Sequence, residues 1–112
     1  MASRYLLTGP VGGQYRFVLK AANGETILNS ERYTSKANAL GGIQSVRTNS
    51  PLDERYVRKN AINGQPMFNL KAANGEIIGT SETYSTPAAR EAGIASTKVN
   101  GPTAPLDDQT TA

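Results

Sequence analysis

Apolar and polar residues alternate between residues 15 and 22 of this chain. The apolar residues on one side of this stretch are Tyr15, Phe17, Leu19 and Ala21. A period of two that includes aromatic residues predicts a half-buried β-strand. Asn23-Gly24 follows and predicts a tight turn, because glycine reaches positive φ without steric cost. A second strand should therefore return beside the first one.

Two hairpin geometries fit this turn. A two-residue loop at Asn23-Gly24 would pair Lys20 with Ile27 and place both on one face. A three-residue loop over residues 22–24, with Gly24 in the left-handed bulge position, would pair Leu19 with Ile27 instead. We favour the three-residue loop, because it keeps the apolar side chains on one face of the hairpin.

The hairpin sequence occurs twice in the chain. Phe17-Val-Leu-Lys-Ala-Ala-Asn-Gly-Glu-Thr-Ile27 returns 51 residues later as Phe68-Asn-Leu-Lys-Ala-Ala-Asn-Gly-Glu-Ile-Ile78. When residues 17–51 are aligned with 68–102, 18 of the 35 positions are identical. Such self-similarity at a fixed offset indicates an internal duplication.

A helix is predicted after each hairpin. Ser35 and Thr86 are candidate N-caps, because a hydroxyl can accept a hydrogen bond from an unpaired N–H of the first turn. The helices should run to about Thr48 and about Lys98, and Pro51 and Pro102 prevent their continuation. A stripe that would cover the sheet recurs at a spacing of three, at Ala37, Leu40, Ile43 and Val46.

Each unit also begins with a short strand, at Arg4–Leu7 and again 51 residues later. The predicted fold class is α+β: a tandem duplication of a βββα unit, with one antiparallel sheet, two helices packed against it and pseudo-twofold symmetry. Units of about 50 residues are too small to bury a good core alone. We therefore predict a single domain over residues 1–112, built of repeats at about 4–51 and 55–102, with a flexible tail over 103–112.

Composition excludes several kinds of site. The chain has no Cys and no His, so Ser-His-Asp and Cys-His catalytic sets and zinc sites built on His or Cys are impossible. No phosphate-binding glycine motif follows a strand. We therefore expect no metal, no cofactor and no enzymatic activity. No long apolar run or apolar signal core occurs, so we expect a cytoplasmic protein that does not enter a membrane.

Polar residues that recur in both units are the first candidate binding set. The candidates are Lys20, Lys71, Glu31, Glu82, Tyr33 and Tyr84. Structural roles are the competing interpretation: each tyrosine precedes a helix cap and can pack on the first turn, and each glutamate lies where a helix N-terminus favours negative charge.

A basic group provides the second candidate set. The net charge is +3, and the densest cluster is Arg55, Tyr56, Arg58 and Lys59. A strand with arginine and tyrosine could contact a phosphate backbone or stack on a base. The aromatic motif of an RNA-recognition sheet is absent, however. A net charge of +3 is also ordinary for soluble proteins.

The repeated motif resembles that of a known family. Phe-x-Leu-Lys-Ala-Ala-Asn-Gly-Glu-x-Ile is followed by Ser-Glu-x-Tyr and then by Gly-Ile-x-Ser, at Gly42–Ser45 and Gly93–Ser96. This pattern is similar to the repeat of the YegP-like family of small bacterial and archaeal proteins, over about residues 4–107. The resemblance implies tandem βββα units in one sheet. It implies no activity, cofactor or catalytic residue.

Three functions are therefore weighed. The first is a non-enzymatic binding or accessory module with a protein partner. The second is association with nucleic acid or the ribosome through the basic group. The third is a small enzyme at the junction of the repeats. We expect a monomer, because the duplicated chain already supplies both halves, and sheet-edge pairing is the alternative route to a dimer.

Overall fold

A computed structural model describes residues 2–111 of the chain. It contains two helices and one seven-stranded sheet, which confirms the predicted mixed α+β class. The first unit comprises β1 (Arg4–Val11), β2 (Gln14–Lys20), β3 (Thr26–Asn29) and α1 (Lys36–Asn49). The second comprises a short 3-10 helix η1 (Asp53–Arg55), then β4 (Tyr56–Asn60), β5 (Pro66–Lys71), β6 (Ile77–Thr80) and α2 (Pro87–Asn100). A last strand, β7 (Leu106–Asp108), follows α2.

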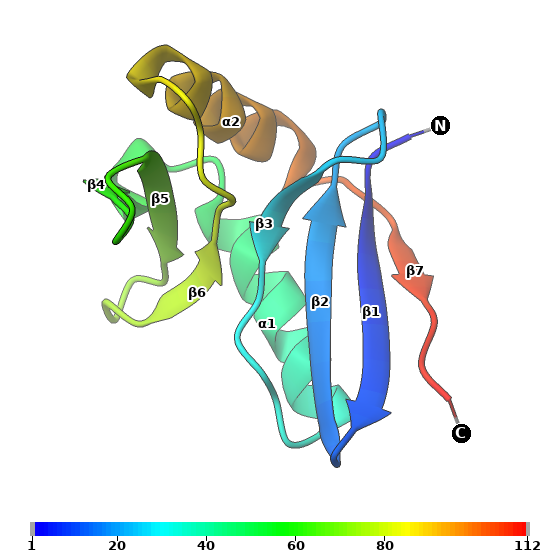
Figure 1. Cartoon of the computed structure of the whole chain (residues 1–112). Helices are drawn as coiled ribbons and strands as arrows, with labels where there is room; N and C mark the ends of the chain where they lie inside the picture. Colours follow the sequence, from blue (N-terminus) through cyan, green and yellow to red (C-terminus); the bar gives the residue numbers. More distant parts are fainter. Residues whose placement is uncertain (1, 112) are drawn as a thin grey trace.

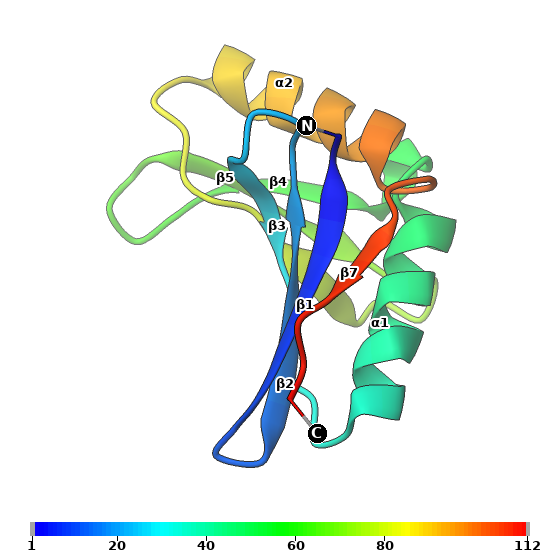
Figure 2. The same cartoon turned by 90° about the vertical axis from the view of Figure 1, so that its right-hand side faces the viewer.

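The strands are ordered β4-β5-β6-β3-β2-β1-β7 across the sheet. All neighbours are antiparallel except β1 and β7, which are parallel. Both helices cover the same, concave side of the sheet (Figures 1 and 2). Each helix packs on strands of both units: α1 contacts β2, β5 and β6, and α2 contacts β5 and β3. The two units therefore share a single core.

The units meet where β3 lies beside β6. The paired residues there are Asn29 and Thr80, which are themselves 51 positions apart. On the helix-covered face beside this pair, Leu28 is completely buried and fills the space next to Gly79. A Cβ at Gly79 would overlap the Leu28 side chain.

The hairpin loop is the favoured three-residue one, but the register of the strands differs from the prediction. The Ala21 amide donates to the Glu25 carbonyl, and the Ala21 carbonyl accepts the Gly24 amide. Gly24 has a positive φ of 88°. Lys20 pairs with Thr26, whereas Leu19 pairs with Leu28 and not with Ile27. Ile27 is therefore the extra residue of a β-bulge. The bulge allows Ile27 and Leu28, which are adjacent in sequence, both to be buried, with exposures of 7% and 0%.

The helices begin at the predicted caps. Ser35 accepts a hydrogen bond from the Asn38 amide, and Thr86 accepts one from the Ala89 amide. The predicted apolar stripe of the first helix is only partly right, because Ala37 and Leu40 are exposed. The buried face of α1 consists of Ala39, Gly42, Ile43, Val46 and Asn49. These positions follow the true helical period, whereas a constant spacing of three drifts around the helix.

The C-terminal segment lies against the outer strand of the sheet, whereas the sequence led us to expect a flexible tail over residues 103–112. β7 adds to the outer edge of β1. Beyond β7, the Gln109 amide donates to the Leu7 carbonyl at 2.8 Å and the Thr111 amide to the Gly9 carbonyl at 3.0 Å. Two aspartates of β7 form ion pairs, Asp107 with Arg4 and Asp108 with Lys36. Ala112 lies outside the described residues.

Candidate binding cleft

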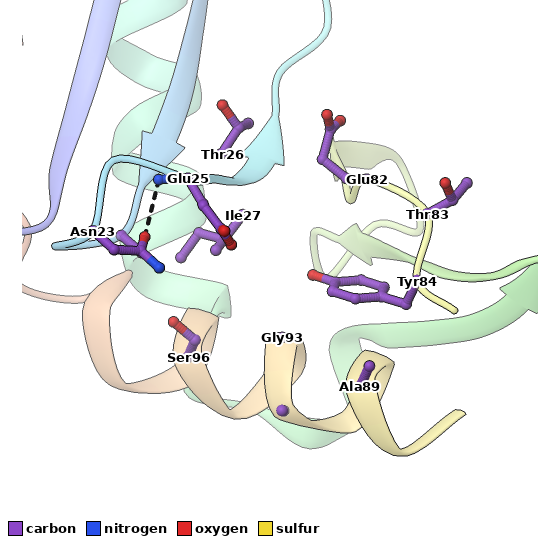
Figure 3. Close-up of a pocket in the computed structure, with 12 residues that line it drawn as sticks. Asn23, Glu25, Thr26, Ile27, Glu82, Thr83, Tyr84, Ala89, Gly93 and Ser96 are labelled. Atoms are coloured by element: carbon purple, nitrogen blue, oxygen red, sulfur yellow. Dashed lines mark hydrogen bonds between the residues drawn. The ribbon is translucent and has the colours of Figure 1, made fainter. Parts of the chain in front are cut away.

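A cleft of about 600 Å³ opens between the turn after β2 and the helix α2 (Figure 3). It therefore combines the hairpin of the first unit with the loop and helix of the second. Its polar lining residues are Asn23, Glu25, Thr26, Glu82, Thr83, Tyr84 and Ser96. Its apolar and small lining residues are Ala21, Ile27, Ala89, Ala92 and Gly93.

The two carboxylates of the cleft are placed by local backbone chemistry. The side-chain oxygen of Asn23 accepts the Glu25 amide at 3.0 Å, and this bond fixes the turn that carries Glu25 (Figure 3). Glu82 follows Ser81, whose hydroxyl accepts the Phe68 amide and donates to the Glu82 carbonyl. The Glu82 carboxylate accepts a bond from the Asn29 side chain at 2.8 Å. Both carboxylates belong to exposed residues at the rim of the cleft.

Tyr84 forms the wall of the cleft between these carboxylates and α2. Its ring stacks on Phe68 with 6.4 Å between centroids, and its amide donates to the Pro66 carbonyl. The ring also lies against Gly93 in the middle of α2, where any Cβ would overlap its hydroxyl. The hydroxyl end of the ring thus reaches the second turn of α2, one turn beyond the first-turn packing expected from the sequence. The hydroxyl points from the loop into the cleft (Figure 3).

Burial raises the pKa of the Tyr84 hydroxyl, and the nearby charges of Glu82 and Glu25 raise it further. Burial also raises the pKa of Tyr33, the matching tyrosine of the first unit, with a smaller contribution from Glu31. Two carboxylates thus raise the pKa of Tyr84, whereas one carboxylate raises the pKa of Tyr33. The cleft thus offers an aromatic ring in a field of negative charge, an environment that suits a cation.

The six candidate residues from the sequence do not form one site. Glu82 and Tyr84 line the cleft. Tyr33 occupies the corresponding place in the first unit, stacked on Phe17 and lying against Gly42. Lys20 and Lys71 flank the buried Leu19 and Leu70 in their strands, so strand alternation directs them to the other face of the sheet. The predicted face of Lys, Glu and Tyr is therefore split between two sides of the sheet.

Sequence reasoning did not assign the glycine of the Gly-Ile-x-Ser motif. Gly42 and Gly93 leave room for the tyrosine rings, so each Tyr-Gly pair is a packing unit. The signal was present as a tyrosine nine residues before a glycine in both copies. Glu25 also recurs, as Glu76, but only the fold brings Glu25 to the tyrosine of the other unit.

The basic candidate set is dispersed as well. Tyr56 is only 6% exposed and its hydroxyl donates to the Ser50 carbonyl, so its ring is not available to stack on a base. Arg58 binds Asp53 and Glu91 at 3.0 and 2.9 Å. Arg55 donates to the side chain of Asn49. Lys59 is exposed on the outermost strand.

Two further features concern only the part of the chain that the structure describes. No group of three or more His, Cys, Asp and Glu side chains is placed to hold a metal ion within residues 2–111. In the same range, neither helix combines the length and the apolar character needed to cross a membrane.

Comparison with known proteins identifies the family. The description "Domain of unknown function (DUF1508)" matches residues 11–56 and again residues 57–108. The chain belongs to this family. It is 58% identical over 110 residues to the UPF0339 protein YegP of Escherichia coli O6:H1, covering 98% of this chain and all of that protein. The resemblance to YegP-like proteins inferred from the repeated motif is thereby confirmed.

Solved structures agree with this assignment. The solution NMR structure of YegP from E. coli, described as a protein of unknown function, superposes with a TM-score of 0.92 at 55% identity. That match covers 100% of this chain and 97% of the other. A UPF0339 protein from Shewanella oneidensis, also solved by NMR, gives a TM-score of 0.90 at 53% identity and covers 98% and 93% of the two chains. The family relationship gives the fold and assigns no activity.

Proposed function

We propose that this protein is a non-enzymatic binding module whose cleft receives a positively charged group of a protein partner. The observation that carries the proposal is that Tyr84 shares a cleft of about 600 Å³ with Glu25 and Glu82, whose charges act on its hydroxyl. A cation over an aromatic face is attracted by the ring, and carboxylates at the rim add a favourable field. A lysine or arginine side chain also carries an apolar stem, which suits the alanines and Ile27 of the lining.

The first test is an NMR titration of the full chain with short lysine-rich peptides. We expect saturable shifts at the amides of Glu25 and Tyr84, weakening with salt because exposed charges are screened. Glu25→Gln and Glu82→Gln should each weaken binding several-fold. Glu76→Gln is the matched control, because Glu76 holds the position of Glu25 in the other unit. Equal weakening by all three variants would refute the cleft as the binding site.

The alternative function, a small enzyme, can be tested separately. It requires turnover of some substrate that is lost when one polar pair is changed, such as Lys20 with Lys71. These lysines lie on the face away from Tyr84. A loss of turnover in the Lys20→Ala, Lys71→Ala double variant would therefore contradict two claims: that the cleft is the functional site, and that the protein is not an enzyme. We expect no such activity.

Nucleic-acid or ribosome association receives less support from the geometry. The ring of Tyr56 belongs to the core, and Arg58 is engaged by two carboxylates. Binding through this set would depend on Lys59 and the remaining exposed cations. Retention of RNA at low salt that drops on Lys59→Glu would favour this alternative over the cleft.

We also propose that the chain arose by tandem duplication and has pseudo-twofold symmetry. Matching bonds in the two units support this: Ser30 and Ser81 each accept the amide of the buried phenylalanine, and Asn23 and Asn74 each close the same turn. Because one chain supplies both halves, we expect a monomer. Light scattering at micromolar concentration would reveal a dimer if this expectation is wrong.

A further inference from the structure

Two hydrogen bonds connect the uncovered face of the sheet to the rim of the cleft. Nη2 of Arg16, in β2, donates to Oδ1 of Asn29 at 3.1 Å. Nδ2 of Asn29, in β3, donates to Oε2 of Glu82 at 2.8 Å. The same nitrogen lies 3.4 Å from the carbonyl of Thr80, its partner in β6. The network therefore crosses the junction between the two units.

Asn29 can join these two side chains because its amide has a donor end and an acceptor end. A guanidinium only donates hydrogen bonds, and an ionised carboxylate only accepts them. With Arg16 bonded to Oδ1, the nitrogen of Asn29 is directed at Glu82. The amide also separates the two charges: within residues 2–111, no ion pair joins Glu82 to a cation. Glu82 is thus oriented without being neutralised by a neighbouring cation.

The other half of the molecule lacks this network. The 51-residue offset gives three matched pairs, which are Arg16 with Met67, Asn29 with Thr80 and Glu82 with Glu31. Met67 has no N–H or O–H group to donate, and no hydrogen bond joins the Thr80 side chain to Glu31 in the part of the chain that is described. Thr83, which lines the cleft, is matched by Arg32, an exposed cation. The loop of the first unit therefore combines an unsupported carboxylate with a positive charge.

We propose that Asn29 and Arg16 are positioning residues of the cleft: they hold Glu82 ready for the cation of the partner, and they confine binding to one basic segment per chain. This inference rests on the proposed function and adds which residues prepare the site and how many partners it takes. A carboxylate that is already oriented loses less conformational freedom on binding than a mobile one. At the matching place in the first unit, Arg32 opposes a second basic segment.

The test is a titration of the full chain with a short lysine-rich peptide, followed by NMR and by isothermal titration calorimetry. One peptide should bind per chain, with saturable shifts at the amides of Glu82 and Tyr84 and none at Glu31 and Tyr33. Asn29→Thr introduces the residue found at the matching position and should weaken binding about five-fold, the effect of one hydrogen bond. Combined with Glu82→Ala, which removes the carboxylate, Asn29→Thr should have little further effect.

Arg16→Met separates positioning from net charge. Removal of a positive charge near the cleft would by itself strengthen the binding of a cationic peptide. Because Arg16 holds the Asn29 amide, the variant should instead weaken binding about two-fold. With threonine at position 29 no amide remains to be held, so Arg16→Met should then only strengthen binding. Lys71→Met, which removes another cation from the same face of the sheet, is the matched control and should not weaken binding.

The possible failures are distinguishable. Binding that neither Asn29→Thr nor Arg16→Met weakens would refute the network and leave the proposed function in place. Both side chains lie half-buried on the face without helices, so native amide spectra are expected for both variants. Two peptides per chain, with shifts also at Glu31 and Tyr33, would refute the limit to one segment. Absence of saturable shifts in the unmodified protein would refute the proposed function and this inference together.

Discussion

The two units share a backbone plan but differ where they touch each other. In the sheet, the first unit has Leu28 and the second has Gly79 at the matching position. At the helix ends, the first has Ser50 and the second has Gly101, and a Cβ at Gly101 would overlap the Ser50 side chain. In both pairs the larger residue fills the space that the glycine leaves open.

This pattern shows what a single chain can do that two identical units cannot. In a homodimer of one unit, both positions at the contact would carry the same residue. Two leucines would overlap in the sheet, and two glycines would leave a void. A chain that holds both units can place a large residue against a small one. Within residues 2–111, it also adds β7 to one edge of the sheet and no strand to the other. The comparison yields four tests, ordered by expected effect.

The largest effect is expected from Gly79→Leu. The new side chain must compete with the completely buried Leu28, and overpacking a core costs about 3 kcal/mol when neighbours cannot move away. Urea unfolding monitored by tyrosine fluorescence measures the loss. The double variant Gly79→Leu, Leu28→Gly exchanges the two residues and should recover most of the stability. A double variant no more stable than the single one would show that the space between the units is not shared.

Gly93→Ala should lower the free energy of unfolding by about 2 kcal/mol, although alanine normally stabilises a helix by about 1 kcal/mol relative to glycine. The loss arises because the added Cβ overlaps the Tyr84 hydroxyl. Gly41→Ala is the matched control: its Cβ meets open space, so the variant should gain about 1 kcal/mol. A gain in both variants would mean that the tyrosine moves aside freely.

The repeat itself could be predicted from the sequence because its signals are local. The Asn-Gly turns, the hydroxyl caps Ser35 and Thr86 and the proline stops each depend on a few neighbouring residues. The bulge at Ile27 could not be read in this way, because two adjacent apolar residues leave the strand register ambiguous. The cleft could not be predicted for a different reason: Glu25 comes near Tyr84 only because α2 packs against the hairpin of the other unit.

The basic group and the tail illustrate the same limit. Arg55, Tyr56, Arg58 and Lys59 are consecutive or nearly so, but strand alternation directs Tyr56 into the core and Lys59 to the open face. The tail is rich in Pro, Thr and Asp, a composition typical of disorder. In the structure the tail contacts β1 through backbone hydrogen bonds and pairs with Arg4 and Lys36, and no local pattern reveals these contacts.

Tyr5 and Tyr56 test whether the units are equally tied to the helix ends. The Tyr5 hydroxyl donates to the Gly101 carbonyl and that of Tyr56 to the Ser50 carbonyl, and both bonds are buried. Tyr5→Phe and Tyr56→Phe should therefore each cost about 1 kcal/mol in urea unfolding.

Burial raises the pKa of both hydroxyls in the folded state above the ordinary value of 10.0. Stability should consequently fall as the pH rises above 10, because the unfolded chain then loses protons that the folded chain keeps.

The double variant Tyr5→Phe, Tyr56→Phe is the control for that pH dependence. It should flatten the alkaline decline without changing the profile near neutrality. An equally steep decline in the double variant would assign the effect to other groups, such as the lysines.

The smallest effect is expected at the sheet edge that β7 covers. The bond from Lys36 and those from Thr110 hold the pKa of Asp108 well below its ordinary value of 3.8. A depressed folded-state pKa stabilises the docked tail above that value and loses this contribution as the pH falls through the lower folded pKa. Asp108→Asn should therefore speed hydrogen exchange at the Gln109 and Thr111 amides at neutral pH and leave the global unfolding midpoint nearly unchanged. If these two amides exchange at the same rate in Asp108→Asn as in the unmodified protein, backbone pairing alone holds the strand. The difference between the two sheet edges would then depend on the hydrogen bonds of β7 and not on its charge.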